Sequence, residues 1–191
     1  MERRVTEDPE EVGAEVREEV RSWLQRNLPS KKPTALEERR SWHKCLHSAG
    51  YCGITWPVEY GGQGLGAMRQ AIVEEELARA DAPTPLNQAG IEVAGPSILL
   101  FGSDAQKFQR IRNLLSADEL WCQLYSEPGA GSDLASLRTF AERRGERYFV
   151  TGQKLWTSEG SWADFGILLA RTDRTETGRN GISCFILNMR Q

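Results

Sequence analysis

Residues 125–133 read Tyr-Ser-Glu-Pro-Gly-Ala-Gly-Ser-Asp, and residues 152–158 read Gly-Gln-Lys-Leu-Trp-Thr-Ser. The first segment sets small residues and a proline between hydroxyl side chains, which is typical of a turn whose backbone amides are open to a ligand. In the second segment, Trp156 comes two residues before the hydroxyl of Ser158. Two positions of that spacing lie on the same face of a strand, so we expect both side chains to meet one flat ring.

A planar redox ring such as isoalloxazine would suit this combination of an indole, a hydroxyl donor and open backbone amides. Taken alone, a serine in such a turn more often bonds the turn itself, and a tryptophan more often lies in a core. The occurrence of both segments in one short stretch favours contact with a ligand. The two segments therefore predict part of a flavin site.

Before these segments, the hydrophobic pattern has the period of an α-helix. Apolar residues at steps of three and four predict a helix over residues 12–24 that begins with Val12 and ends before Pro29. Residues 51–66 are rich in glycine and predict a loop. We expect Asp104 to be the N-cap of the last helix before the pattern changes. The other predicted helices cover residues 35–49, 67–80, 85–101 and 104–116.

From residue 120 onward, short apolar runs replace the helical pattern. They predict strands over residues 120–125, 165–170 and 182–187, and a hairpin over residues 140–151 that turns at residues 144–146. Residues 174–180 are charged and predict an exposed hairpin loop. The expected fold class is therefore α+β, with a helical domain over residues 1–118 and a β domain over residues 119–191.

Composition excludes several classes of function. Among 191 residues, 27 are acidic and 24 are basic, and no stretch combines clustered Lys and Arg with aromatic residues as a nucleic-acid surface does. No run approaches the roughly 18 apolar residues that a membrane span needs. The first residues contain no apolar core of a signal peptide, so the expected location is the cytoplasm.

The cysteines and histidines give no strong sign of a metal site. The four cysteines have no paired spacing, which disfavours zinc and disulfide frameworks. His43 and His47 are four residues apart and would allow a weak metal pair on a helix, but we favour two ordinary histidines on a helix surface. Similarly, we expect the carboxylates of residues 74–76 to be mainly solvated.

Three further segments carry a resemblance to a known family: Gly-Ile-Thr-Trp-Pro-Val-Glu-Tyr-Gly-Gly over residues 53–62, Glu-Glu-Glu-Leu-Ala over residues 74–78, and Phe-Gly-Ser-Asp-Ala-Gln-Lys over residues 101–107. With them, nearly the whole chain resembles the acyl-CoA dehydrogenase family of flavoproteins. The resemblance implies an all-α N-terminal domain followed by the first part of an antiparallel β-barrel-like middle domain. The family's C-terminal helical bundle, which carries the catalytic glutamate, has no counterpart in this sequence.

The resemblance implies the N-terminal portion of an FAD-dependent acyl-CoA dehydrogenase, which desaturates an acyl-CoA thioester and passes a hydride to flavin N5. The implied partners are an acyl-CoA, electron-transfer flavoprotein or a similar acceptor, and further subunits of a homo- or hetero-oligomer. Without the bundle we expect the chain to be inactive alone, and we assign it no catalytic residue. Two alternatives remain: a non-catalytic subunit of a heteromeric acyl-CoA dehydrogenase, or an incomplete product without activity.

The resemblance also assigns cofactor-binding positions. The backbone of residues 123–125 would run beside the ring, Trp156 would shield it, and Ser158 would donate toward N5. Gly131 and Ser132 match a turn near the pyrimidine end of the ring and the acyl-CoA, so Ser132 is also an expected substrate contact. The full set of expected FAD contacts is Gln123, Leu124, Tyr125, Ser126, Gly131, Ser132, Trp156 and Ser158.

Three other residues have open or structural interpretations. We expect Glu127 to hold the turn before Pro128 rather than to act as a base, because the family's base lies in the missing bundle. Gly90 and Ala94 lie in a helix that corresponds to one bordering the family's acyl cavity. Their small size would either leave room for a bulky acyl group or allow close packing of helices.

Overall fold

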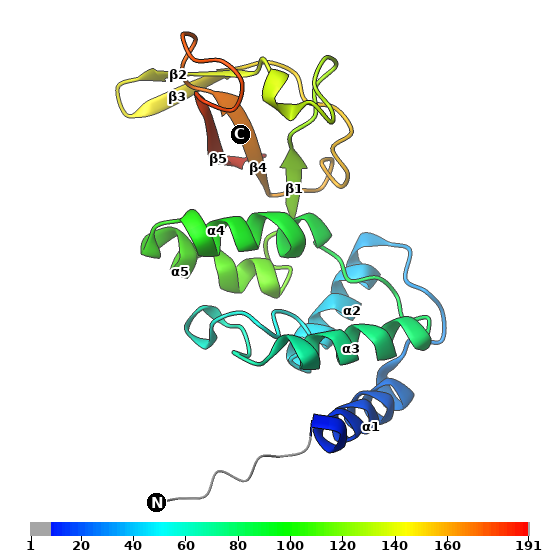
Figure 1. Cartoon of the computed structure of the whole chain (residues 1–191). Helices are drawn as coiled ribbons and strands as arrows, with labels where there is room; N and C mark the ends of the chain where they lie inside the picture. The colour runs from blue at the N-terminus through cyan, green and yellow to red at the C-terminus, as the bar shows by residue number, and fades with distance from the viewer. Residues whose placement is uncertain (1–8, 191) are drawn as a thin grey trace, which may run out of the picture. The chain divides into compact units, whose positions relative to one another are not determined.

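The computed structural model describes residues 9–190, with side chains from Gly13 onward (Figure 1). The expected domains include residues 1–8 and 191, and the expected first helix includes the side chain of Val12; these lie outside the described residues. The chain divides into two compact units, one made of residues up to Leu86 with Ile111–Ala117, the other of Asn87–Arg110 with residues from Asp118 on. The expected domain boundary near residue 119 stays a prediction.

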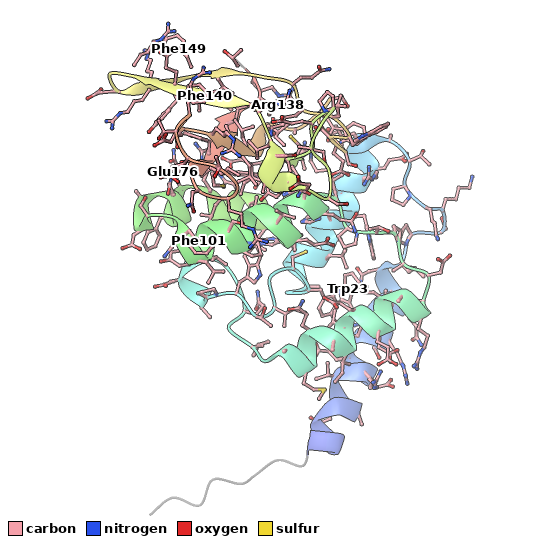
Figure 2. All side chains as sticks on the ribbon, turned by 45° about the horizontal axis from the view of Figure 1, so that its top comes forward. Trp23, Phe101, Arg138, Phe140, Phe149 and Glu176 are labelled. Carbon is pink, nitrogen blue, oxygen red and sulfur yellow. The ribbon has the colours of Figure 1, made fainter. Side chains whose placement is uncertain are left out.

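The first unit is built from the helices α1 (Pro9–Asn27), α2 (Leu36–Ser48) and α3 (Ala67–Arg79), which confirm the helical periods in the sequence. The apolar faces of α1 and α3 pack together, with Val20 and Val73 both fully buried. Figure 2 labels Trp23 of α1, whose ring lies 5.7 Å from that of Trp42 and 5.0 Å from that of Tyr51. The glycine-rich stretch between α2 and α3 is a loop, as predicted, with one short 3₁₀ turn, η1 (Val58–Tyr60).

Glu76 corrects the expectation that the carboxylates of residues 74–76 are solvated. Its side chain is only 2% exposed and forms ion pairs with Arg17 at 2.8 Å, with Arg21 at 2.7 Å and with Arg79 at 3.6 Å. The hydrogen bond from Arg21, together with that from Arg17 and against the effect of desolvation, lowers the pKa of Glu76 to about 2. This carboxylate therefore ties α1 to α3.

His43 likewise corrects the expectation of two helix-surface histidines. Its side chain is fully buried, with Nε2 2.8 Å from the carbonyl oxygen of Leu115 and 3.8 Å from Sγ of Cys52. His47 is half-buried. Within residues 9–190, no group of three or more His, Cys, Asp and Glu side chains is arranged to hold a metal ion.

The predicted helix over residues 85–101 begins later than expected and contains an irregular turn. A π-helical turn, η2 (Gly90–Ala94), leads into α4 (Gly95–Phe101). Asn87, with a positive φ of 65°, accepts a hydrogen bond from the Trp121 amide at 2.7 Å and donates one to the carbonyl of Glu119 at 3.1 Å. A Cβ on Gly90 would come within 2.6 Å of the Asn87 side chain, so Gly90 allows close packing at the start of this helix.

Helix α5 (Asp104–Leu115) begins with a different cap from the predicted one. The Ser103 hydroxyl accepts a hydrogen bond from the Gln106 amide at 3.3 Å, and the Gln106 side chain accepts one from the Ser103 amide at 2.9 Å. This reciprocal pair is a capping box. Ser103 is therefore the N-cap, and the prediction of Asp104 was wrong by one position. The first part of α5 belongs to the second unit and its last residues, Ile111–Leu115, belong to the first.

The second unit also contains an open five-stranded sheet, which together with the helices confirms the expected α+β class. The antiparallel pairing expected from the sequence is present between β2 and β3 and between β4 and β5, whereas β1 runs parallel to β4. β2 joins β4 through the parallel pair Phe140 and Arg171, so the sheet is mixed. The strands are β1 (Trp121–Leu124), β2 (Phe140–Arg144), β3 (Arg147–Thr151), β4 (Phe165–Arg171) and β5 (Ile182–Asn188).

The core of the sheet is formed by Cys122, Leu124, Ala141, Leu168 and Ala170 of the strands, together with Ala163 just before β4. The loop over residues 174–180 is exposed, as predicted. Arg171 fixes both this loop and the 3₁₀ turn η3 (Leu134–Ser136), donating hydrogen bonds to the carbonyls of Gly178 at 2.9 Å and Ala135 at 2.6 Å. None of the helices in residues 9–190 combines the length and the apolar character that crossing a bilayer requires.

Candidate functional site

A cavity of about 120 Å³ lies between the end of β1 and the segment that connects β3 to β4. We call it the Trp156 pocket. Both predicted segments contribute to it, and so does Ala89, which directly precedes the π-helical turn η2. The lining residues are Ala89, Gln123, Tyr125, Ser126, Leu155, Trp156 and Ser158, all from the second unit.

The strand alternation of β1 decides which side chains reach the pocket. Gln123 and Tyr125 line it, whereas Leu124 between them is buried in the core of the sheet with Cys122 and Leu168. The sequence predicts that the backbone of Leu124, not its side chain, runs beside the ring, and a buried side chain is compatible with that prediction. Burial raises the pKa of the Tyr125 phenol above its ordinary value of 10.0, so this hydroxyl remains a hydrogen-bond donor at neutral pH.

Trp156 and Ser158 reach the same pocket through a turn, and the prediction that they lie on one strand was wrong. Residues 152–157 form no strand, and Trp156 has a left-handed φ of 57°, which is uncommon for a residue other than glycine. The Ser158 amide donates to the Trp156 carbonyl at 3.1 Å, closing a tight turn. Trp156 is 89% exposed, so its indole is open to a ligand.

A set of hydrogen bonds fastens the two segments to each other. The Leu155 amide donates to the Ser126 carbonyl at 2.8 Å. The ammonium group of Lys154 donates to the Tyr125 carbonyl at 2.9 Å and to the Glu127 carboxylate at 2.8 Å. These bonds set the distance between the hydroxyl-bearing turn and the indole-bearing turn.

Glu127 holds the turn, as the sequence predicts. Besides Lys154, its carboxylate accepts hydrogen bonds from the amides of Arg138 at 2.7 Å and Thr139 at 2.9 Å. Desolvation raises the pKa of this carboxyl, but the hydrogen bonds from Lys154 and Thr139 outweigh it and lower the pKa to about 2. A carboxylate so fully engaged is a poor proton acceptor.

Comparison with known proteins agrees with this architecture. The protein-family model of the acyl-CoA dehydrogenase N-terminal domain matches residues 10–118, and the family model of the acyl-CoA dehydrogenase middle domain matches residues 122–191. The chain belongs to the acyl-CoA dehydrogenase family. The resemblance inferred from the sequence is therefore confirmed.

Among relatives of this acyl-CoA dehydrogenase family member, acyl-CoA dehydrogenase IpdE1 of Mycobacterium tuberculosis is 40% identical over 189 residues, covering 93% of this chain and 49% of IpdE1. The ChsE4-ChsE5 complex from the same organism is 36% identical with a TM-score of 0.82, covering 98% of this chain and 49% of the matched chain. A glutaryl-CoA dehydrogenase from Mycobacterium smegmatis in complex with FADH2 is 25% identical with a TM-score of 0.66, covering 97% and 46%. The chain thus spans about half the length of the proteins it matches.

Three of the expected contacts of this family member do not line the Trp156 pocket: Leu124, whose side chain lies in the core of the sheet, and Gly131 and Ser132. Gly131 and Ser132 are exposed, and they follow the turn that the Glu127 and Ala130 backbones close with reciprocal hydrogen bonds of 2.8 and 3.1 Å. The expected contacts that the structure does bring together are Gln123, Tyr125, Ser126, Trp156 and Ser158.

Sequence reasoning missed three residues of the site. Ala89 and Leu155 line the pocket, and Lys154 joins its two segments although it lines no part of it. Ala89 comes from a separate helix and carries no chemical signal. Lys154 had one usable signal. It lies in one predicted segment and the oppositely charged Glu127 lies in the other, so the two could form an ion pair once the segments meet.

Proposed function

We propose that this chain is the N-terminal portion of an FAD-dependent acyl-CoA dehydrogenase and that the Trp156 pocket receives one edge of the flavin ring. The observation that carries the proposal is the convergence of the exposed Trp156 indole with the Ser126 and Ser158 residues at one open cavity. Membership of a flavoprotein family supports it, as does the similarity to a glutaryl-CoA dehydrogenase in complex with FADH2.

The residues present fit the edge of such a ring. A cavity of about 120 Å³ is well below the roughly 300 Å³ of a pocket that encloses a small ligand, so it would cover part of the ring. The lining combines an aromatic face with amide and hydroxyl groups from Gln123, Tyr125 and the two serines. A flat heterocycle with polar atoms at its rim needs this combination of stacking and hydrogen bonding.

On this proposal each residue has a separate task. The flavin, when bound, supplies the chemistry of accepting a hydride from the β-carbon of an acyl thioester. Trp156 covers the ring and excludes water. Ser158 is exposed, and its hydroxyl would donate a hydrogen bond toward the ring atom that becomes more negative during reaction, which would stabilise the transition state more than the ground state. Gly131 and Ser132 would extend the contact toward the pyrimidine end and the acyl-CoA.

The Trp156 pocket contains no candidate for the base that removes the α-proton. Tyr125 is the one titratable residue in its lining, and burial keeps that phenol protonated. Glu127 is engaged by Lys154 and two backbone amides. We therefore propose that the base comes from outside the Trp156 pocket and from none of its lining residues, and we expect no turnover from this chain alone.

A second candidate function is a subunit of a heteromeric acyl-CoA dehydrogenase. It is favoured by the similarity to a chain of the ChsE4-ChsE5 complex, which pairs two differently named proteins. In this case a partner subunit would supply the base and the remaining FAD contacts, and electron-transfer flavoprotein or a similar acceptor would reoxidise the flavin. A homo-oligomer remains the alternative if the rest of the family architecture lies on the same polypeptide.

Bleaching of flavin absorbance by an acyl-CoA tests the proposal. In the complete assembly, Ser158→Ala should slow bleaching by about 10-fold, since one charge-stabilising hydrogen bond is lost. Trp156→Ala should weaken FAD binding. Phe149→Ala serves as the matched control, because this exposed aromatic lies on the β2–β3 hairpin and not in the pocket (Figure 2). Equal rates and FAD affinities in all three variants and in the unmodified protein would refute the proposal.

A further inference from the structure

Lys154 and Glu127 form an ion pair of unusual burial for charged residues. Their side chains are 8% and 7% exposed, and the ammonium nitrogen lies 2.8 Å from the carboxylate oxygen. Most other ion pairs in residues 9–190 have at least one partner in contact with water, such as Arg144 with Glu142, whose side chains are 62% and 51% exposed. Removing two charges from water is costly unless their geometry and further hydrogen bonds compensate.

The compensating hydrogen bonds come from backbone groups of three neighbouring segments. Lys154 donates to the Tyr125 carbonyl at the end of β1. Glu127 accepts from the amides of Arg138 and Thr139, just before β2. The pair therefore connects three irregular stretches that no strand ladder holds: the turn at 125–130, the approach to β2 and the segment after β3.

We infer that Lys154 and Glu127 are positioning residues that fix the spacing between the Ser126 turn and the Trp156 turn, and thereby the width of the site for the flavin edge. Neither residue lines the pocket, so they act through the backbone. We call the Lys154–Glu127 pair with its hydrogen bonds to the backbone the clamp. The identity of its ligand rests on the proposed function, whereas the clamp itself rests on these contacts.

Two variants separate positioning from simple stabilisation. Lys154→Met leaves the Glu127 carboxylate buried without its cation, which destabilises the fold and also loosens the two turns. Combining Lys154→Met with Glu127→Gln removes the uncompensated charge, while the Gln side chain can still accept a backbone hydrogen bond. The double variant therefore recovers stability, but it still lacks the link from residue 154 to the turn.

Amide hydrogen exchange of the full chain reads the clamp directly, without any ligand. We expect the Leu155 amide, which is bonded to the Ser126 carbonyl, to exchange at least about 10-fold faster in both Lys154→Met and the double variant. Thermal unfolding should show a lowered midpoint in the single variant and a largely recovered one in the double variant. Arg144→Met, which breaks the exposed pair on the β2–β3 hairpin, should leave Leu155 exchange unchanged.

Titration with FAD, followed by flavin absorbance, supplies the second readout. In the double variant we expect FAD affinity at least about 10-fold weaker and an altered absorption band, although stability has recovered. Unchanged Leu155 exchange in both Lys154 variants, or loosened exchange together with unmodified FAD affinity and spectrum, would overturn the inference. Failure of the unmodified chain and of its complete assembly to bind FAD would instead overturn the proposed function, while Leu155 exchange would still decide whether the clamp exists.

Discussion

Two buried glutamates, one in each unit, have pKa values of about 2 but fix different kinds of structure. Glu76 in the first unit is bound by side chains of Arg17, Arg21 and Arg79, which project from two regular helices. Glu127 in the second unit is bound by a buried lysine and by two backbone amides of irregular segments. The first carboxylate joins helices that are already formed, whereas the second determines the course of the backbone at the candidate site.

The largest expected effect is that of Lys154→Met on the second unit. Removing one partner of a buried ion pair should lower the free energy of unfolding by about 3 to 5 kcal/mol, because the remaining charge stays buried. Urea denaturation followed by tryptophan fluorescence measures this change. A loss as small as that of an exposed ion pair would show that water reaches Glu127 and that the comparison between the two carboxylates is mistaken.

Glu76→Gln should have a smaller effect, on the order of 1 to 3 kcal/mol, because the arginines that it leaves unpaired are partly exposed and become hydrated. Urea denaturation again provides the measurement. Glu75→Gln is the matched control, since its side chain is 48% exposed on the same helix, and it should leave stability nearly unchanged. Equal effects of the two substitutions would contradict the burial of Glu76.

Acidification should erase the difference between Glu76→Gln and the unmodified chain. The folded-state pKa of Glu76, about 2, lies below its ordinary value of 4.5, so its contribution is complete above pH 4.5 and is lost as the pH falls toward 2. Denaturation curves recorded across this window should converge at its acidic end. A constant difference down to pH 2 would mean that the ion pairs with arginine do not set this pKa.

The smallest expected effect concerns His43, the buried histidine of the first unit. Desolvation lowers its pKa below the ordinary 6.5, so the folded state binds fewer protons than the unfolded state. Stability should therefore begin to fall as the pH drops below 6.5, before the carboxylates protonate. His43→Gln should flatten this part of the pH profile while lowering stability at pH 8. An identical slope in the variant would assign it to other groups.

The sequence predicted the regular elements well because hydrophobic periods depend on neighbouring residues. It failed where burial depends on a distant partner. Glu76 is buried because arginines 55 and 59 residues away reach it, and His43 is buried because its imidazole meets the carbonyl of Leu115. Neither relation leaves a local pattern in the sequence.

The candidate site was predicted in composition but not in local geometry. Trp156 and Ser158 do line one pocket, yet through a turn with a left-handed tryptophan, a conformation that residue type disfavours and that hydrogen bonds of the surrounding segments sustain. The sequence did not reveal the role of Lys154, because its ammonium group bonds a backbone carbonyl and a carboxylate that lie more than 20 residues away in the chain. The residue types were therefore enough to predict most of the side chains that line the pocket, whereas the way they come together depends on the tertiary fold.

The most direct test of the account is a nuclear magnetic resonance titration of the chain with FAD. If the flavin edge enters the Trp156 pocket, the indole N–H of Trp156 and the amides of Ser126 and Ser158 should shift together, while the amide of Phe149 on the hairpin should not. The Trp156 signal is assigned by its disappearance in Trp156→Phe. Shifts that spare these residues and gather elsewhere in the chain would contradict the claim that the two turns form the flavin platform.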